Sequence, residues 1–215
     1  MSAGLVRLSR IFCRWPSHCP RLRTCVWSEG LDRGDFAGVH ADRYQKDLTI
    51  DKAWQDEVLV VYKINGRPLS KERGGPVRLA VPGWFGTNSM KWLSKISLQA
   101  SRAPCPYTTT FYNEPDPASG PGTTRPVWQV EPNSMIVRPK PGEQLRGPII
   151  HVSGWTWYHT ETAVLEISVD GGKTWTPGTV EPRVDYGWQA FTATVELGAG
   201  EHTMHSRATA QDRLA

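Results

Sequence analysis

The stretch "GGPVRLAVPGWFGTNSMKWLSKI", residues 74–96, defines the first half of the chain. Its apolar run from Val77 to Val81 predicts a short strand, flanked on both sides by residues that control the backbone. A Gly-Gly-Pro precedes the run, and a Pro-Gly-Trp follows it. Small polar side chains, Asn88 and Ser89, and then the cation Lys91 come soon after. We therefore expect a strand followed by a loop that presents polar groups.

Strand patterns continue on both sides of this stretch. Residues 57–64, "EVLVVYKI", predict a strand, and the Asn65-Gly66 pair after it favours a hairpin turn with two successive positive φ values. Residues 77–82 predict the next strand. Alternating apolar residues predict another over residues 90–98.

The second half of the chain differs in composition and in its pattern of apolar residues. Residues 100–126 are rich in Pro, Gly, Ser and Thr, which indicates a connector between folded units. Short strand patterns with intervening turns recur from residue 127 onward. One of them, Ala163 to Val169, alternates between two faces with a period of two and ends at an Asp-Gly-Gly turn. About 90 residues of this pattern match an immunoglobulin-like sandwich in size. The fold class that we expect is mainly β with some α: an α+β unit followed by that sandwich.

Composition and charge exclude several classes of protein. The 215 residues include 10 Trp, 20 Gly and 17 Pro, which is typical of a turn-rich sheet protein. The net charge of +4 comes from residues 1–28, which hold five Arg and no acid and leave 20 basic against 21 acidic side chains. Neither a nucleic-acid face nor the ~18 consecutive apolar residues of a membrane helix is indicated. The four cysteines show no zinc-type spacing, so we expect no metal site of that kind: Cys13, Cys19, Cys25 and Cys105.

The N-terminus carries a helical pattern. Within residues 5–15, four apolar residues recur on one face and three arginines on the other, until Pro16 ends the run. This predicts an amphipathic cationic helix. An Arg-rich, acid-free segment is typical of a mitochondrial presequence. An unmatched start, joined to a body whose upstream portion is missing, is the alternative. Location therefore stays open, mitochondrial in the first case and otherwise cytoplasmic.

Two ordered motifs carry a resemblance to a known family. Residues 74–96 and residues 126–175, "PVWQVEPNSMIVRPKPGEQLRGPIIHVSGWTWYHTETAVLEISVDGGKTW", resemble the sulfite oxidase family of molybdopterin-dependent oxidoreductases. The first is similar to the end of the family's cofactor-binding domain, and the second to the immunoglobulin-like dimerisation domain after it. The similarity extends from about Cys25 to Ala208. It implies three parts: an Arg-rich leader or unmatched N-terminus, a partial molybdopterin-binding domain, and a C-terminally shortened dimerisation domain, over residues 1–24, 25–125 and 126–215.

The resemblance assigns a molybdenum-molybdopterin cofactor to the loop after the first motif's strand. A pterin cofactor that ends in a phosphate needs close backbone N–H groups, which Gly83 and Gly86 permit, together with hydroxyl donors and a cation. Arg73 stands where many relatives have a histidine; it can donate a hydrogen bond but cannot accept one. The residues at the family's cofactor-contacting positions are Asp32, Arg73, Arg78, Ser89, Met90 (through its backbone) and Lys91.

The same resemblance implies an activity and partners. Tyr112 stands where relatives place a tyrosine beside an oxyanion substrate, and Arg183 corresponds to an arginine that the second domain contributes to the anion pocket. The implied reaction is oxygen-atom transfer to sulfite or a similar small oxyanion. The implied assembly is a homodimer formed through the C-terminal sandwich, with neither nucleic acid nor membrane as a partner.

One feature of the family is missing from this sequence. Relatives hold molybdenum through a cysteine in a "C-x-G-N-R" type segment upstream of "GLD", and no such segment occurs here. We therefore expect a truncated form whose chain alone binds pterin weakly and is inactive. The alternative is a non-catalytic module for dimerisation and interaction. A third, weaker hypothesis is a carbohydrate-binding sandwich that uses Trp155, Trp157 and Tyr158.

Overall fold

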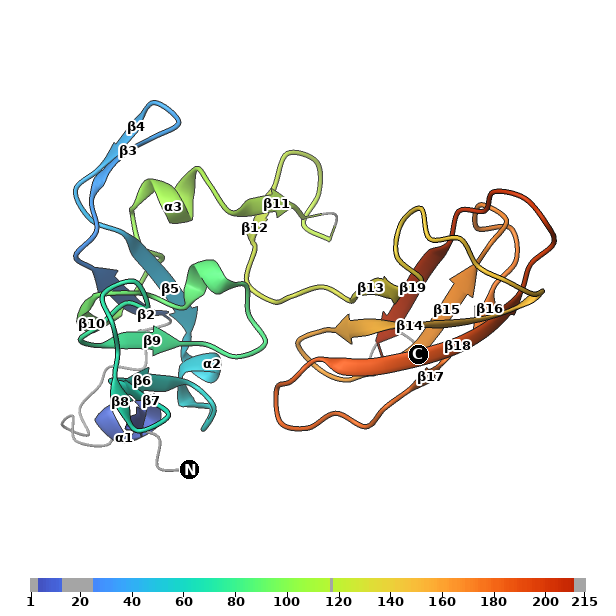
Figure 1. Ribbon diagram of the computed structural model, residues 1–215. Helices are drawn as coiled ribbons and strands as arrows, with labels where there is room; N and C mark the ends of the chain where they lie inside the picture. The colour runs from blue at the N-terminus through green and yellow to red at the C-terminus, as the bar shows by residue number, and fades with distance from the viewer. Residues whose placement is uncertain (1–3, 13–24, 117, 211–215) are drawn as a thin grey trace. The chain divides into compact units, whose positions relative to one another are not determined.

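The chain divides into two units, Met1–Trp128 and Gln129–Ala215 (Figure 1). The computed structural model describes residues 4–12, 25–116 and 118–210. Both units consist of short antiparallel strands, and the short helices of the described residues lie in the first unit, which confirms the predicted mainly β fold class. No helix in these described ranges is long and apolar enough to cross a bilayer.

A three-stranded sheet with the order β10–β2–β5 forms the centre of the first unit. Its strands are β2 (Cys25–Gly30), β5 (Gln45–Thr49) and β10 (Leu93–Gln99), all antiparallel. The helix α2 (Ile50–Trp54) follows β5 directly, and the Thr49 hydroxyl caps it by accepting the N–H of Lys52 at 3.2 Å. The apolar core of the unit comprises Leu8, Val26, Leu48, Ala53, Val58, Leu79, Val81, Trp84 and Met90.

The N-terminal segment is part of this unit. Instead of a helix over residues 5–15, the chain forms β1 (Leu5–Arg7), which pairs with β6 (Leu59–Val61), and then α1 (Leu8–Phe12). Leu8 is fully buried. The helix prediction was wrong at residues 5–7, because pairing with a strand distant in sequence outweighs local periodicity. The end of that predicted helix, residues 13–15, lies outside the described residues.

The predicted strands of the first half are present, in shorter form. The third strand of the β1–β6 sheet is β9 (Arg78–Ala80). The Asn65-Gly66 turn joins β7 (Lys63–Ile64) to β8 (Arg67–Pro68), with φ values of 51° and 76° as predicted. A further hairpin, β3 (Gly34–Phe36) with β4 (Val39–Ala41), stands out from the unit (Figure 1).

Residues 100–126 are more than a connector. They contain α3 (Pro106–Thr109) and a ribbon of β11 (Asn113–Pro115) with β12 (Thr124–Pro126). Ala103 and Thr108 within the segment are fully buried. The composition correctly indicates turns, but it does not reveal that buried side chains hold the segment against β5.

The second unit is a two-sheet sandwich. One sheet has the order β13–β14–β18–β17, and the other has the order β16–β15–β19. Leu165 and Ile167 on one sheet pack with Val152 and Phe191 of the other in a separate apolar core, as the alternation predicts. The strands are β13 (Asn133–Arg138), β14 (Ile149–Trp157), β15 (Thr162–Ser168), β16 (Thr176–Pro177), β17 (Thr179–Val180), β18 (Gln189–Glu196) and β19 (His205–Ala210).

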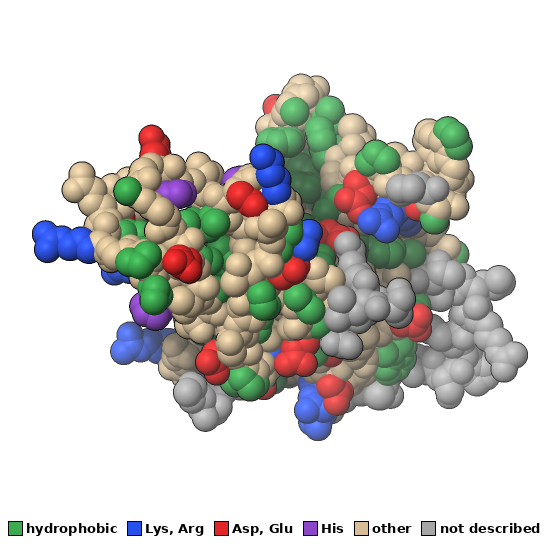
Figure 2. Space-filling view, turned by 90° about the vertical axis from the view of Figure 1, so that its right-hand side faces the viewer, with side chains coloured by type: hydrophobic (Ala, Val, Ile, Leu, Met, Phe, Trp, Pro, Cys, Tyr) green, Lys and Arg blue, Asp and Glu red, His purple; other side chains and the backbone are tan. Residues whose placement is uncertain are grey.

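Charged side chains of both signs are mixed on the molecular surface. On the face in Figure 2, Lys and Arg side chains are interspersed with Asp and Glu, and hydrophobic side chains lie among polar ones. A surface with this distribution has no extended single-sign field on the face in view.

Candidate functional site

The loop after β9 folds back along that strand. Leu79 N–H donates to the carbonyl of Met90 at 2.8 Å, and Leu93 N–H donates to the carbonyl of Val77 at 2.9 Å. The hydroxyl of Ser89 accepts the N–H of Val81 at 3.0 Å. Between them the short 3₁₀ helix η1 (Gly86–Asn88) turns the chain. Residues 89–91 therefore lie beside the strand that carries Arg78.

Arg78 connects the two sides of this loop. Its guanidinium donates to the carbonyl of Arg73 and to the carbonyl of Ser89, both at 3.2 Å. The Nε atom is buried and has no hydrogen-bond partner among the described residues. Burial lowers the pKa of Arg78, since a low-dielectric surrounding opposes its charge. One donor thus remains for a group that the chain does not supply.

Lys91 is held beside the same loop. Its Nζ atom donates to the carbonyl of Glu72 at 2.7 Å. Gly74 has a φ of +87°, and a Cβ there would lie 2.7 Å from the Cγ atom of Lys91, so only glycine leaves room for the lysine stem. The pKa of Glu72 is lowered, chiefly by a hydrogen bond from its own backbone and to a smaller degree by Lys91.

Asp32 lies near Lys91, just after β2. Its carbonyl accepts the N–H of Tyr44 at 2.9 Å, which anchors the backbone. The Oδ1 atom is buried without a partner in the described chain. Burial raises the pKa of Asp32, while a hydrogen bond from its own backbone and the charge of Lys91 oppose that rise. A Cβ at Gly30 would meet the Oδ1 atom, with Met90 Sδ at 2.9 Å and Lys91 O at 3.0 Å.

The structure thus brings together all six residues at the predicted cofactor-contacting positions, which we call the pterin cluster: Asp32, Arg73, Arg78, Ser89, Met90 and Lys91. Its unpaired buried atoms are complementary to the proposed cofactor. The Asp32 acceptor fits the N–H donors of a pterin ring, and the Arg78 donor, beside two further cations, fits an anionic phosphate. Met90 itself is buried in the core. In the part of the chain that the structure describes, no group of three or more His, Cys, Asp or Glu could hold a metal.

Tyr112 belongs to an aromatic cluster that also includes Tyr44 and Tyr107. Its backbone has a φ of +55°, a conformation uncommon for a residue with a side chain and frequent at functional sites. The Tyr107 ring lies between the rings of Tyr44 and Tyr112, with centroid distances of 4.6 Å and 6.5 Å. Two phenylalanines extend the cluster: Phe36 and Phe111.

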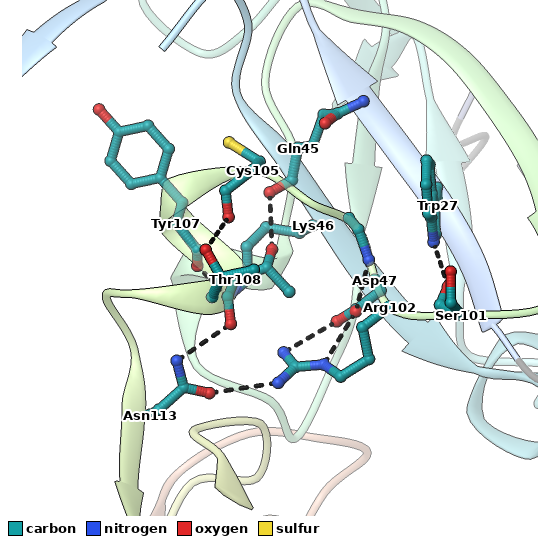
Figure 3. Close-up of polar contacts among 12 residues, drawn as sticks. Trp27, Gln45, Lys46, Asp47, Ser101, Arg102, Cys105, Tyr107, Thr108 and Asn113 are labelled. Atoms are coloured by element: carbon teal, nitrogen blue, oxygen red, sulfur yellow. Dashed lines mark hydrogen bonds and ion pairs between the residues drawn. The ribbon is translucent and has the colours of Figure 1, made fainter. Parts of the chain in front are cut away.

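A buried polar network lies beneath these rings (Figure 3). Lys46 donates to the carbonyl of Tyr107 at 3.1 Å, and its ammonium lies 5.0 Å from the centroid of the Tyr112 ring. Arg102 donates to both carboxylate oxygens of Asp47, at 3.0 Å and 3.3 Å, and to Asn113 Oδ1 at 3.2 Å. The network fixes the residue next to Tyr112 and therefore constrains the tyrosine backbone.

Tyr44 links the aromatic cluster to the pterin cluster. Its hydroxyl donates to the carbonyl of Thr87 in η1 at 2.9 Å, while its ring packs on Tyr107. Burial raises the pKa of Tyr44, so the phenol stays protonated and can donate this hydrogen bond. The sequence alone does not single out Tyr44 or Lys46. Their stretch, "DRYQKDLT", is polar and has no motif that would distinguish them from surface residues.

Arg183 belongs to the second unit. Its guanidinium donates to the carbonyls of His159 and Thr160, and it stacks on the Tyr186 ring at 5.3 Å. Its part in an anion pocket stays a prediction. The second unit also has a groove of about 500 Å³ that includes Trp175, His205 and Arg207 in its lining and none of the predicted site residues.

Comparison with known proteins shows similarity to a family of oxidoreductases. Residues 6–107 match the family described as "Oxidoreductase molybdopterin binding domain". The match begins upstream of Cys25, where we expected the similarity to start. Mitochondrial sulfite oxidase of Homo sapiens is 29% identical over 194 residues, which cover 84% of this chain and 35% of that protein. Sulfite oxidase of Gallus gallus is 29% identical over 190 residues, with coverages of 80% and 41%.

A solved structure agrees at the level of the fold. The crystal structure of the sulfane dehydrogenase SoxCD from Paracoccus pantotrophus is similar with a TM-score of 0.76 and 24% identity, over 96% of this chain and 51% of that one. The chain spans about a third of the length of the mammalian relatives that it matches. The matched domain and these relatives make the chain similar to the sulfite oxidase family of molybdopterin-binding oxidoreductases, and the solved structure agrees in fold.

Proposed function

We propose that the chain supplies the pterin-binding loop and the substrate-facing tyrosine of a sulfite oxidase-type molybdenum oxidoreductase. The reaction would be oxygen-atom transfer to sulfite or a similar small oxyanion. The observation that carries this proposal is the pair of buried, unpaired atoms in the pterin cluster, Asp32 Oδ1 and Arg78 Nε. Buried polar atoms are rarely left unsatisfied, so such a pair indicates a missing ligand.

Each residue of the pterin cluster has a defined part in this proposal. Arg73, Arg78 and Lys91 would bind the phosphate end through charge-assisted hydrogen bonds. The Ser89 hydroxyl, which already accepts from Val81, keeps its own O–H to donate. The Asp32 carboxylate would accept from the pterin ring. Once bound, the molybdenum cofactor would supply the two-electron oxygen-transfer chemistry.

The substrate side rests on the aromatic cluster. The phenol of Tyr112 can donate a hydrogen bond to an oxyanion, and its left-handed backbone is held by Val127 N–H, which donates to the Tyr112 carbonyl at 2.9 Å. A positioned donor is what an oxyanion requires for binding and orientation.

The test measures pterin retention and turnover separately, because the "C-x-G-N-R" segment of relatives does not occur in this sequence. The full chain is produced in cells that make molybdopterin, and its pterin and molybdenum contents are determined before sulfite-dependent dye reduction is assayed. The sequence alone suggests weak binding, but the buried unpaired atoms Asp32 Oδ1 and Arg78 Nε lead us to expect that wild-type protein retains pterin. Arg78→Met should lose it at least about tenfold. The exposed Arg67→Met variant is the matched control and should retain pterin. Wild-type protein without pterin would refute the proposal.

A non-catalytic homodimerisation module is the second candidate, and an exposed apolar surface favours it. Met135 and Trp155 are direct cross-strand neighbours on β13 and β14, and they are 47% and 41% exposed. Ile149 on the same strand as Trp155 is 61% exposed. Exposed apolar side chains on one face of a sheet are typical of protein interfaces. We call Met135, Ile149 and Trp155 the apolar face. A stable dimer without pterin would favour this second function.

A further inference from the structure

Lys46 is an unusual residue because it is a lysine with no exposed surface. It is the second residue of β5, paired in register with Ser28 of the central strand β2. Lysine is almost never fully buried unless it is paired with a carboxylate. Only one acceptor in the described chain bonds its ammonium, the carbonyl of Tyr107 at 3.1 Å.

The neighbouring carboxylate does not neutralise this charge by contact. Both oxygens of Asp47 bond to Arg102, and Oδ2 also accepts the N–H of Ala103 at 3.1 Å. Lys46 forms no ion pair with any described residue, whereas Lys52, on the adjoining helix, pairs with Glu57 at 2.7 Å. Lys46, Arg102 and Asp47 together therefore leave one positive charge in excess.

Groups that face Lys46 come from three neighbouring segments. Asp47 is its neighbour on β5, Arg102 lies in the segment before α3, and Cys105 stands at the start of α3. Beyond these the ammonium faces the Tyr112 ring, at 5.0 Å from its centroid. The excess charge thus lies behind the tyrosine that is proposed to meet the substrate. Figure 3 shows Lys46 close to Tyr107 and Thr108 of α3.

We propose that Lys46 is a positioning residue that draws a small oxyanion to Tyr112 and makes the binding of that anion depend on pH. This inference rests on the proposed function, since it presumes that Tyr112 meets an oxyanion. A positive charge behind the ring attracts an anion at the hydroxyl edge, and the low dielectric of the interior transmits this attraction further than water would. Lys46 acts through Tyr112 and makes no contact with the anion itself.

The direction in which anion affinity changes with pH follows from the charge of the protonated Lys46 side chain. Burial lowers the pKa of Lys46 to about 8, while Asp47 opposes this shift. The ammonium is charged below that pH and neutral above it, so anion affinity should fall as the pH rises through about 8. By linkage, a bound anion must raise the pKa of Lys46 by a matching amount.

The test uses the full chain with its cofactor and takes sulfate as the probe, because the charge of sulfate is constant from about pH 6 to pH 10. Sulfate affinity is measured by calorimetry across that range. We expect Lys46→Met to raise the Kd about tenfold at neutral pH and to remove the fall in affinity above pH 8. In sulfite oxidation the same variant should raise KM with a smaller effect on kcat.

Two matched variants control for other causes. Lys52→Met removes the same charge from a paired lysine and should leave sulfate affinity and its pH profile unchanged. Cys105→Ala removes the thiol at the start of α3, and the profile should persist. A Lys46→Met protein that binds sulfate with wild-type affinity and the wild-type profile overturns the inference, even if the protein holds pterin and turns over sulfite.

A second measurement covers the case in which Lys46→Met does not fold. In wild-type protein labelled with carbon-13 at the lysine ε position, the Lys46 signal should titrate near pH 8 and move to higher pH when sulfate is added. A Lys46 signal that does not respond to sulfate overturns the inference. Loss of pterin from wild-type protein would instead count against the proposed function, so the two failures are distinguishable.

Discussion

Asp32 and Arg78 carry opposite charges, yet each keeps a buried polar atom without a partner in the described chain. Burial opposes ionisation in both, since it raises the pKa of the acid and lowers the pKa of the base. Such groups destabilise the folded protein until a ligand completes their hydrogen bonds. At the scale of the residue, the pterin cluster is therefore expected to be less stable empty than filled.

Replacing Asp32 by Asn should reduce pterin retention at least about tenfold and raise the melting temperature of the cofactor-free protein at neutral pH. The folded pKa of Asp32 lies above its ordinary value of 3.8, so the wild-type chain loses stability as the pH rises from that value through the raised pKa. Asn carries no charge to bury, and the stability difference should vanish below about pH 4. Thermal unfolding at several pH values measures this. A constant difference at every pH would exclude burial of charge as the cause.

Asp170 is the centre of the turn between β15 and β16. Its carboxylate accepts N–H donors from Thr174 and Lys173, both at 3.0 Å, and hydroxyls from Thr174 and Ser168 at 2.7 Å and 2.8 Å. These bonds, first of all the one from the Thr174 backbone, lower the pKa of Asp170. At the scale of the element, one side chain thus organises the Asp-Gly-Gly turn that the sequence predicts.

Asp170→Ala should lower the urea midpoint of the second unit at neutral pH, and Asp170→Asn should lower it less because the amide oxygen still accepts both N–H groups. A depressed pKa stabilises the fold above the ordinary value of 3.8, and this stabilisation is lost as the pH falls. The midpoints of wild type and Ala variant should therefore converge in acid. Equal effects of the two substitutions would show that charge, and not the accepting oxygen, dominates.

Gly154 lies in β14 where the sandwich is most closely packed. A Cβ there would meet the carbonyl of Met135 and lie 2.7 Å from the Phe191 ring. Gly154→Ala should therefore destabilise the second unit by about 1–3 kcal/mol, as overpacking of a core does. Chemical denaturation followed by tryptophan fluorescence measures the change. Gly198→Ala is the matched control, since nothing lies within 4 Å of its Cβ and its stability should be near wild type.

At the scale of the whole molecule, each of the two units has its own apolar core and is therefore a separate domain. Each also has a separate proposed task. The first holds the pterin and aromatic clusters, and the second carries the apolar face on β13 and β14. Assembly and cofactor binding are therefore expected to respond to different substitutions.

Trp155→Arg should convert a homodimer that forms through the apolar face into a monomer, because an interface cannot bury an unpaired charge without a large penalty. The melting temperature of the second unit should change little, since Trp155 is 41% exposed within the chain. Sedimentation velocity measures the oligomeric state. Ile64→Arg, at a similarly exposed apolar residue of the first unit, is the control and should leave assembly unchanged. A Trp155→Arg protein that remains dimeric would place the interface elsewhere.

Local patterns were sufficient to predict the mainly β class, the Asn65-Gly66 hairpin and the alternating strands of the sandwich. Each depends on residues within one element or one turn. The spacing of hydrophobic residues and the residue types of a turn can be recognised over such short segments. Motif resemblance also predicts the six residues of the pterin cluster as cofactor contacts, and that role stays a prediction. Five of them lie between residues 73 and 91, where one strand and its returning loop bring them together.

Only the tertiary structure revealed the pairing of β1 with β6, the anchoring of residues 100–126, and the parts played by Tyr44 and Lys46. Lys46 bonds to a residue 61 positions away, and Arg102 to one 55 positions away. A polar stretch such as "DRYQKDLT" reads as surface in sequence, because burial of a lysine depends on which distant segments cover its strand. Contacts over such separations are decided by the packing of the whole unit, and no local pattern encodes them.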